Sequence, residues 1–168
     1  MKKRLILVSI AFLTCSYSLI AQDIALANID SIVVSLPEFK TQQKILESYA
    51  KQLQSTLESK GKELQQKYAD YQQNAANWIP EVLKEKEREM QRLQEELAEF
   101  QQNSQNNLSK KEQEVFKPLF DKAEKGIQMV AKEKGYKFVF PANMLLYAVD
   151  GVDITNDVII KLGGKVGK

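Results

Sequence analysis

The sequence predicts an α+β fold, in which a long antiparallel helical hairpin of coiled-coil type joins a small β body built from both ends of the chain. Residues 38 to 117 contain one glycine and one proline and are rich in Gln, Glu, Lys, Leu and Ala, a composition typical of long helices. Their apolar residues recur at intervals of three, four or seven positions, as in a coiled coil. Short runs of branched and aromatic residues, which favour strands, lie on the two flanks.

The first 21 residues have the features of a secretory signal peptide. Three positive charges at residues 2 to 4 precede the apolar run Leu5 to Leu13, and the segment closes at Ala21. A membrane anchor is the alternative, but a span needs about 18 or more uninterrupted apolar residues, and Thr14, Ser16 and Ser18 interrupt this one. We expect cleavage near Ala21 and export to the periplasm.

Cys15 is the only cysteine of the chain and lies inside the predicted signal peptide. A lipoprotein would require a small residue before it, whereas Thr14 stands there, so we do not expect lipidation. Removal of the signal leaves no cysteine, which is compatible with an oxidising compartment.

The segment after the signal predicts one strand and one short helix. Residues 24 to 29 are apolar and short, which indicates a buried strand. Asp30 or Ser31 could then cap a helix from Ile32 to Leu36.

Two apolar stripes predict the arms of the hairpin. They are interrupted at Asn77-Trp-Ile-Pro80, where proline removes a backbone donor and biases Ile79 away from the helical region, so we expect the chain to turn there. Each arm has about 37 residues, or about 55 Å of helix. A continuous kinked helix is the alternative. The stripe residues are Leu46, Ala50, Leu53, Leu57, Leu64 and Tyr71 in the first arm, and Leu83, Met90, Leu93, Leu97 and Phe100 in the second.

The stripes are imperfect, which predicts weak packing at particular places. Lys60, Lys86 and Ser104 occupy positions where an apolar residue is expected, and residues 101 to 107 are almost wholly polar. Gly61 adds a site of low helix propensity, about 1 kcal/mol below alanine. We therefore expect arms that bend.

The C-terminal part completes the body. A helix from Val115 to Lys134 is expected to kink or restart at Pro118 and to end at Gly135. Residues 136 to 140 and 144 to 149 predict a β-hairpin. Asp153 or Thr155 could cap a last helix over residues 156 to 162, which ends at Gly163.

The chain thus divides into a signal peptide over residues 1–21, a β-rich body from residues 22–39 and 118–168, and hairpin arms over 40–117 with a tip near 77–80. Three short strands bury little core, and their unpaired edges favour pairing with other copies. We expect an oligomer.

The residue types present exclude most enzymatic chemistry. The chain has no histidine, and after the signal no cysteine, so common general bases, thiol nucleophiles and transition-metal ligands are missing. Neither a phosphate-binding loop nor a dinucleotide fingerprint occurs. Without Lys2, Lys3 and Arg4 the 24 basic residues become 21 against 22 acidic ones, which does not favour nucleic acid binding. We expect no enzyme, no cofactor and no metal.

Several segments resemble the Skp/OmpH family of periplasmic chaperones, and the resemblance covers the chain after the signal peptide. They are Ile24-Ala-Leu-Ala-Asn-Ile-Asp30, Leu36-Pro-Glu-Phe39, Val115-Phe-Lys-Pro-Leu119, Val130-Ala-Lys-Glu-Lys-Gly-Tyr136, Tyr147-Ala and Val152-Asp-Ile-Thr155. The resemblance implies a homotrimer in which strands of three subunits form a β-barrel, with three helical hairpins around a cavity. It also implies a holdase that binds unfolded outer-membrane proteins without ATP. The expected trimer body residues are Ile24, Leu26, Ile29, Phe138, Val139 and Leu146.

Large residues outside the stripes are the candidates for client contact on the arms. The alternative for each is local packing or closure of the tip. An envelope adaptor that docks a folded partner is the alternative function. The candidates are Tyr49, Tyr68, Trp78, Ile79 and Val82.

The charge balance departs from the best-known family members, which are markedly basic. Residues 40 to 76 hold six basic and four acidic residues, and 81 to 117 hold seven and nine. We expect this difference to assist helix pairing, and it argues against purely electrostatic client capture.

Overall fold

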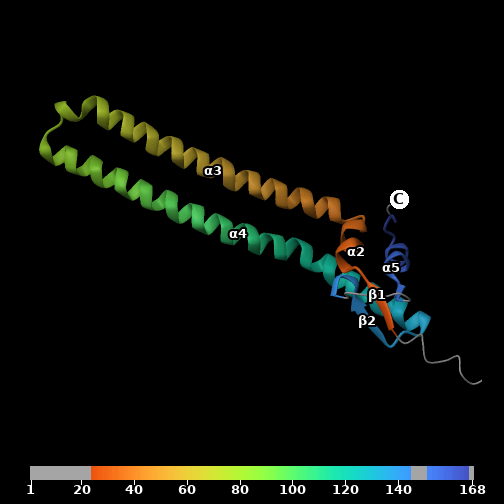
Figure 1. The fold of residues 1–168 in the computed structure, drawn as a ribbon. Helices are drawn as coiled ribbons and strands as arrows, with labels where there is room; N and C mark the ends of the chain where they lie inside the picture. The colour runs from red at the N-terminus through yellow and green to blue at the C-terminus, as the bar shows by residue number, and fades with distance from the viewer. Residues whose placement is uncertain (1–23, 145–150, 167–168) are drawn as a thin grey trace, which may run out of the picture. The chain divides into compact units, whose positions relative to one another are not determined.

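The computed structural model describes residues 24–144 and 151–166; the predicted signal peptide, Cys15 and Leu146 lie outside them. Contacts divide the chain into two compact units. We call the unit formed by the residues up to Phe39 and from Pro118 the body, and the unit Lys40–Lys117 the hairpin. The elements are β1 (Ile24–Ala27), α2 (Ile29–Ser35), α3 (Phe39–Asn74), a 3-10 turn (Ala75–Asn77), α4 (Pro80–Lys134), β2 (Phe138–Pro141), a 3-10 turn (Ala142–Met144), β3 (Val152–Asp153) and α5 (Thr155–Lys161) (Figure 1).

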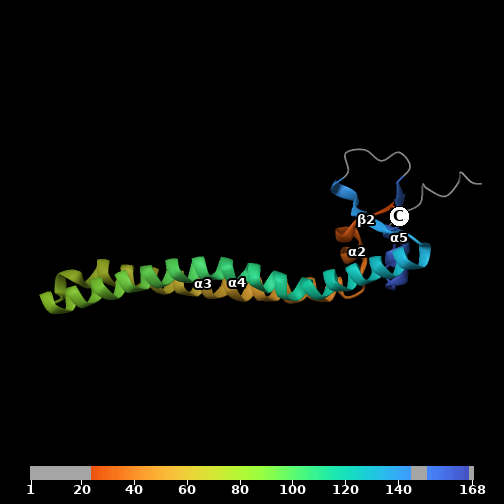
Figure 2. The same ribbon diagram turned by 90° about the horizontal axis from the view of Figure 1, so that it is seen from below.

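The predicted hairpin is confirmed, and a continuous kinked helix is not formed. α3 and α4 lie side by side and antiparallel in the hairpin unit (Figures 1 and 2). The chain turns between Asn74 and Pro80, and Pro80 is the first residue of α4, where a helix has no use for a backbone N–H. The N–H of Leu83 donates to the carbonyl of Ile79 over 3.1 Å, which anchors the first turn of α4.

The two helices of the hairpin bury little apolar surface between them. No residue of α3 is buried, and its predicted stripe is only half-buried. Met90 and Leu93 are the buried members of the α4 stripe. In a pair of helices, each apolar stripe contacts only the other helix, and the part of the stripe beyond that contact stays exposed to solvent. This explains the shallow burial.

Ion pairs between the arms supplement this packing. Lys67 Nζ lies 2.7 Å from Glu89 Oε1, and Lys60 Nζ lies 3.6 Å from Glu96 Oε2. In both pairs the base comes from α3 and the acid from α4. This agrees with the charge difference between the arms that the sequence contains.

α4 passes through Pro118 without a break, so the helix does not restart there, and the alternative of a kink at Pro118 stays a prediction. Its end is as predicted. Gly135 has a φ of +80°, and the N–H of Tyr136 donates to the carbonyl of Ala131 over 2.9 Å, the bond pattern of a glycine-terminated helix.

The body contains a three-stranded sheet in the order β2-β1-β3, with both outer strands parallel to β1. The predicted β-hairpin is wrong in its described part. β2 pairs with β1, Met144 belongs to a 3-10 turn, and residues 145–149 lie outside the described residues. Two neighbouring apolar runs suggest a hairpin locally, whereas β2 pairs with β1, three of whose four residues are buried.

The core of the body lies between the sheet, the two short helices and the end of α4. Its largest fully buried side chains are Ile32, Ile154 and Val158. α2 is capped by Asn28, whose Oδ1 accepts from the N–H of Ser31 over 3.0 Å, so the prediction of Asp30 or Ser31 as the cap is wrong. The cap stands earlier because α2 already begins at Ile29.

The last helix ends as predicted but is capped differently. The N-cap of α5 is Ile154, whose side chain makes no capping hydrogen bond, so the prediction of Asp153 or Thr155 as the cap is wrong. Asp153 Oδ1 nevertheless accepts from the N–H of Thr155, the first residue of α5, over 2.7 Å. Gly163 has a φ of +76°, and the N–H of Gly164 donates to the carbonyl of Ile159 over 2.8 Å, which closes the helix.

Candidate functional site

An exposed apolar face lies on the sheet of the body. The register places Ile24 beside Phe138 and Leu26 beside Phe140, so these four side chains share one face. Phe138 is 59% exposed and Ile24 52%, whereas Leu26 is buried. We call these four residues the sheet face. Side chains of this size exposed together indicate an interaction surface.

The other face of the sheet belongs to the interior of the body. Ala25 pairs with Val139 and is fully buried. Val139 is half-buried and lines a hollow of about 500 Å³ with Ile127 and Ala131 of α4. Val139, one of the predicted trimer residues, therefore lies on the side of the sheet that packs against α4.

The remaining predicted trimer residues are dispersed. Ile29 is the half-buried first residue of α2. Leu146 lies outside the described residues. Sequence reasoning missed Phe140, which is 44% exposed, although the alternation of residues 138 and 140 along a strand could have indicated it.

The tip of the hairpin joins aromatic and charged groups. The ring of Trp78 meets the ring of Tyr71 edge-on, with centroids 5.9 Å apart, and Lys86 Nζ lies 5.7 Å from the Trp78 centroid. Trp78 is thereby half-buried and closes the turn. The next residue, Ile79, is exposed. Of the two, Ile79 is the side chain that a partner can reach.

The other candidates for client contact are spread along the hairpin. Tyr68 is exposed, and its hydroxyl accepts a hydrogen bond from Gln94 Nε2. Tyr49 and Val82 are half-buried. Tyr49 and Tyr68 are separated by about 30 Å of helix. The candidates therefore divide between the tip, with Trp78, Ile79 and Val82, and separate positions along α3, and do not form one patch.

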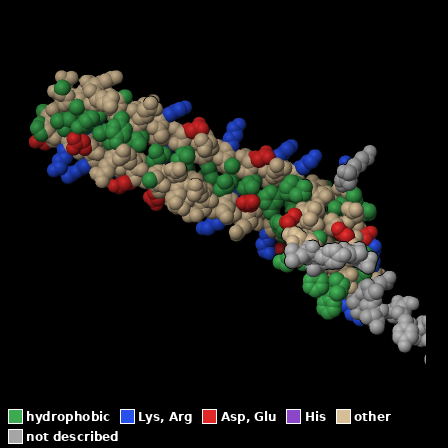
Figure 3. Space-filling model, in the orientation of Figure 1, with side chains coloured by type: hydrophobic (Ala, Val, Ile, Leu, Met, Phe, Trp, Pro, Cys, Tyr) green, Lys and Arg blue, Asp and Glu red, His purple; other side chains and the backbone are tan. Residues whose placement is uncertain are grey.

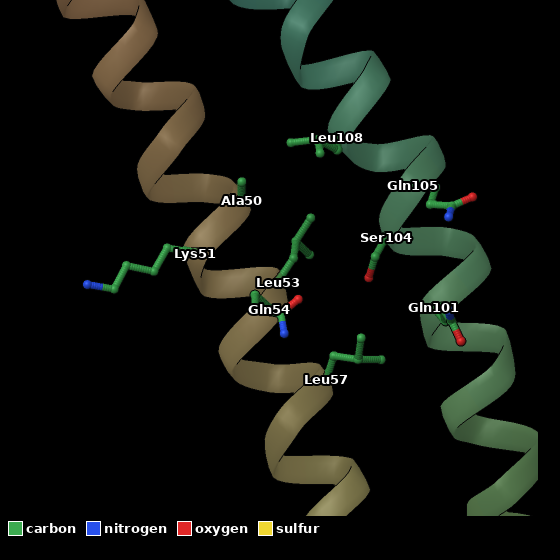
Figure 4. A pocket seen from close by; sticks show the side chains of 9 residues that line it. All are labelled: Ala50, Lys51, Leu53, Gln54, Leu57, Gln101, Ser104, Gln105 and Leu108. Atoms are coloured by element: carbon green, nitrogen blue, oxygen red, sulfur yellow. The ribbon is translucent and has the colours of Figure 1, made fainter.

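A groove between the arms was not predicted as a site. It has a volume of about 540 Å³ and lies beside Ser104, one of the positions where weak packing was expected (Figure 4). Leu53, Leu57 and Leu108 point into the space between α3 and α4. The Ser104 hydroxyl oxygen is buried and has no hydrogen-bond partner in the described part of the chain. The sequence signal for this groove was Ser104 at a position where the apolar stripe of the second arm calls for an apolar residue.

Two hydrogen-bonded pairs on the hairpin shift the pKa values of their members. The hydrogen bond from Lys67 lowers the pKa of the Glu89 carboxyl, and the same bond raises the pKa of Lys67. The Tyr71 hydroxyl donates a hydrogen bond to Glu87 Oε1 over 2.7 Å, and this bond raises the pKa of Tyr71.

Within residues 24–144 and 151–166 no group of three or more Asp or Glu is placed to hold a metal ion. In the same ranges no helix is long and apolar enough to cross a bilayer.

Apolar side chains follow the seam between the two arms and gather again on the body, while Lys, Arg, Asp and Glu project along the outer sides of the arms (Figure 3). These apolar side chains offer contact area to a partner.

Comparison with known proteins agrees with this architecture. A chaperone protein Skp of Yersinia enterocolitica is 28% identical over 160 residues, which is 95% of this chain and 98% of that protein. The chaperone protein Skp of Pectobacterium atrosepticum is 27% identical and aligns with 83% of this chain and 84% of its own length. An uncharacterised protein of Aquifex aeolicus is 43% identical over 58 residues, covering 34% of this chain and 36% of that protein.

The fold has a solved counterpart. The crystal structure of a putative outer membrane chaperone (OmpH-like) from Caulobacter crescentus matches with a TM-score of 0.74 at 15% identity, over 88% of this chain and 87% of that one. A family model described as Outer membrane protein (OmpH-like) matches residues 23–162. The chain therefore belongs to the OmpH-like family, a family of non-enzymatic chaperones.

Proposed function

We propose that the protein is an ATP-independent holdase that keeps unfolded outer-membrane proteins soluble in the periplasm. The observation that carries this proposal is the shallow burial along the hairpin: α3 has no buried residue, and its apolar stripe is half-exposed over the whole arm. Such a surface provides many weak apolar contacts for an unfolded chain. Release then requires only that the client finds better contacts in its own fold.

The proposal extends to a homotrimer assembled through the body. The sheet face is apolar and exposed, and the outer edges of β2 and β3 have no strand partner among the described residues. Pairing with other copies would cover the face and satisfy the edges. Three hairpins would then enclose a cavity for the client.

The proposed compartment rests on the sequence. The features of residues 1–21 predict export, and the OmpH-like family is one of periplasmic chaperones. Absence of cysteine after Cys15 makes the exported chain insensitive to oxidation of thiols.

Equilibrium binding to unfolded and folded forms of one outer-membrane barrel protein tests the function. The barrel protein carries a fluorophore, and its anisotropy is followed as the chain is added without nucleotide. We expect saturable binding of the urea-unfolded form after dilution and none of the detergent-folded form. Equal binding of both forms, or of the folded form alone, would contradict the proposal and favour an adaptor.

A further inference from the structure

The groove between the arms is lined almost entirely by uncharged residues, although the surface of the hairpin is rich in charged ones. Its walls are formed by Leu53, Leu57 and Leu108, and its polar members are amides and one hydroxyl. Lys51 is the one charged residue of the lining, and Figure 4 shows its side chain extending away from the space between the helices. The groove contains no carboxylate.

The neighbouring stretches of the hairpin differ from the groove. Lys60 pairs with Glu96 on one side of it, and Lys111 lies 2.9 Å from Glu114 on the other. Apart from Lys51, the lining of the groove is therefore uncharged, and an ion pair lies on either side of it. A charged side chain that entered between the leucines would lose water without gaining a partner there, because Lys51 extends away from that space.

Ser104 contributes the one hydroxyl group of the groove lining. Its hydroxyl oxygen is buried without a hydrogen-bond partner in the part of the chain that the structure describes. A buried hydroxyl without a partner gains a hydrogen bond when a ligand offers a donor or an acceptor. An extended peptide offers both along its backbone.

We infer that the groove is a subsite for extended, uncharged client segments that alternate apolar and polar side chains, the pattern of membrane-spanning strands of outer-membrane barrels. This inference rests on the proposed holdase function and adds a location and a chemistry to it. The apolar side chains enter between the leucines, and as the arms part to admit them the client backbone bonds to the Ser104 hydroxyl, which is buried in the empty groove.

The size of the groove agrees with a weak subsite. Ala50 to Leu57 spans about 10 Å of helix. An extended chain advances about 3.3 Å per residue, so the groove accommodates about three residues of client. Each hairpin therefore holds a short part of a strand, and retention depends on several such contacts.

Replacing Ser104 with leucine tests the inference, because it fills the groove and removes the hydroxyl. Asn103→Leu is the matched control, since it adds the same side chain at the exposed neighbouring position. Binding of a fluorophore-labelled, urea-unfolded outer-membrane barrel protein should weaken about fivefold for Ser104→Leu, a change of about 1 kcal/mol, and stay the same for Asn103→Leu. Circular dichroism checks that both variants keep their helices.

A second measurement does not depend on filling the groove. In a Cys15→Ser background, Ser104→Cys and Asn103→Cys each place one thiol on the hairpin. The unfolded client should slow alkylation at position 104 more than at position 103. A peptide that alternates Leu and Thr should reproduce this protection, and one that alternates Leu and Glu should not.

The outcomes separate this inference from the proposed function. Failure of the unmodified chain to bind unfolded client would overturn the holdase function and the subsite with it. Normal client binding combined with an unaffected Ser104→Leu variant, or with an unprotected thiol at position 104, would overturn the subsite alone.

Discussion

Thr155 links the two ends of the chain inside the body. Its Oγ1 accepts from the N–H of Asn28, at the end of β1, over 2.9 Å, and its own N–H donates to Asp153. It is 8% exposed. The side chain thus satisfies a backbone donor that lies 127 positions away in the sequence.

Thr155→Val should destabilise the chain, because valine keeps the shape and leaves the N–H of Asn28 without its partner. We expect a loss of about 1–3 kcal/mol in the free energy of unfolding, measured by urea denaturation. Thr56→Val is the control, since the Thr56 hydroxyl bonds within an exposed helix face to the carbonyl of Gln52. Equal losses in the two variants would argue against a special role of Thr155.

Two glycines of the long helices have opposite surroundings. A Cβ on Gly61 would meet nothing within 4 Å, whereas one on Gly126 would lie 2.7 Å from Leu162 Cδ1 and 3.0 Å from Val158 Cγ1. Gly126 therefore permits the close approach of α4 and α5, and Gly61 only lowers helix propensity.

Gly61→Ala should stabilise the chain by about 1 kcal/mol, and Gly126→Val should destabilise it by about 1–3 kcal/mol through overpacking. Urea denaturation measures both changes. Amide exchange over residues 55 to 67 should slow in Gly61→Ala, because the arm becomes stiffer there. Unchanged exchange in that stretch would contradict the expected bending of the arm.

At the scale of the elements, the Lys67–Glu89 pair makes the stability of the hairpin depend on pH. The pKa of Glu89 is lowered by Lys67, so its folded pKa lies below its unfolded one. The corresponding stability is present above the ordinary glutamate pKa of about 4.3 and is lost as the pH falls through the folded value. The raised pKa of Lys67 gives the complementary loss at high pH.

Lys67→Gln should weaken the acid dependence of the hairpin, because Glu89 then loses the partner that holds its pKa down. The measurement is the thermal midpoint at pH 7 and at pH 3.5. The difference between the two midpoints should be smaller in Lys67→Gln than in the unmodified chain and unaltered in Lys62→Gln, an exposed lysine of the same helix. An equal difference in all three would refute the ion-pair explanation.

The elements differ in how far the sequence predicts them. The long helices, the turn before Pro80 and the end at Gly135 follow from composition, periodicity and local backbone chemistry, which act over a few residues. Strand pairing does not, because the parallel partners Ile24 and Phe138 are more than a hundred residues apart and no local signal links them. The weak packing at Ser104 was predictable, but the groove depends on how Leu53 and Leu108 face each other across the arms.

At the scale of the whole molecule, the proposed trimer depends on the sheet face. Phe138→Asp places a charge on this exposed face and should dissociate the trimer, as light-scattering masses would show. Ile160→Asp is the control, because Ile160 is 66% exposed but lies on α5. Val139→Asp is a poorer test, since Val139 lies against α4. A trimeric mass for Phe138→Asp would contradict assembly through this face.

The holdase activity itself is the central claim, and suppression of aggregation tests it most directly. A urea-unfolded outer-membrane barrel protein is diluted into nucleotide-free buffer with increasing amounts of the chain, and light scattering is followed. The account predicts that scattering is abolished near one trimer per client. Scattering that is unchanged at a large excess of the chain would contradict it, and would leave the fold and the family of the protein as they are.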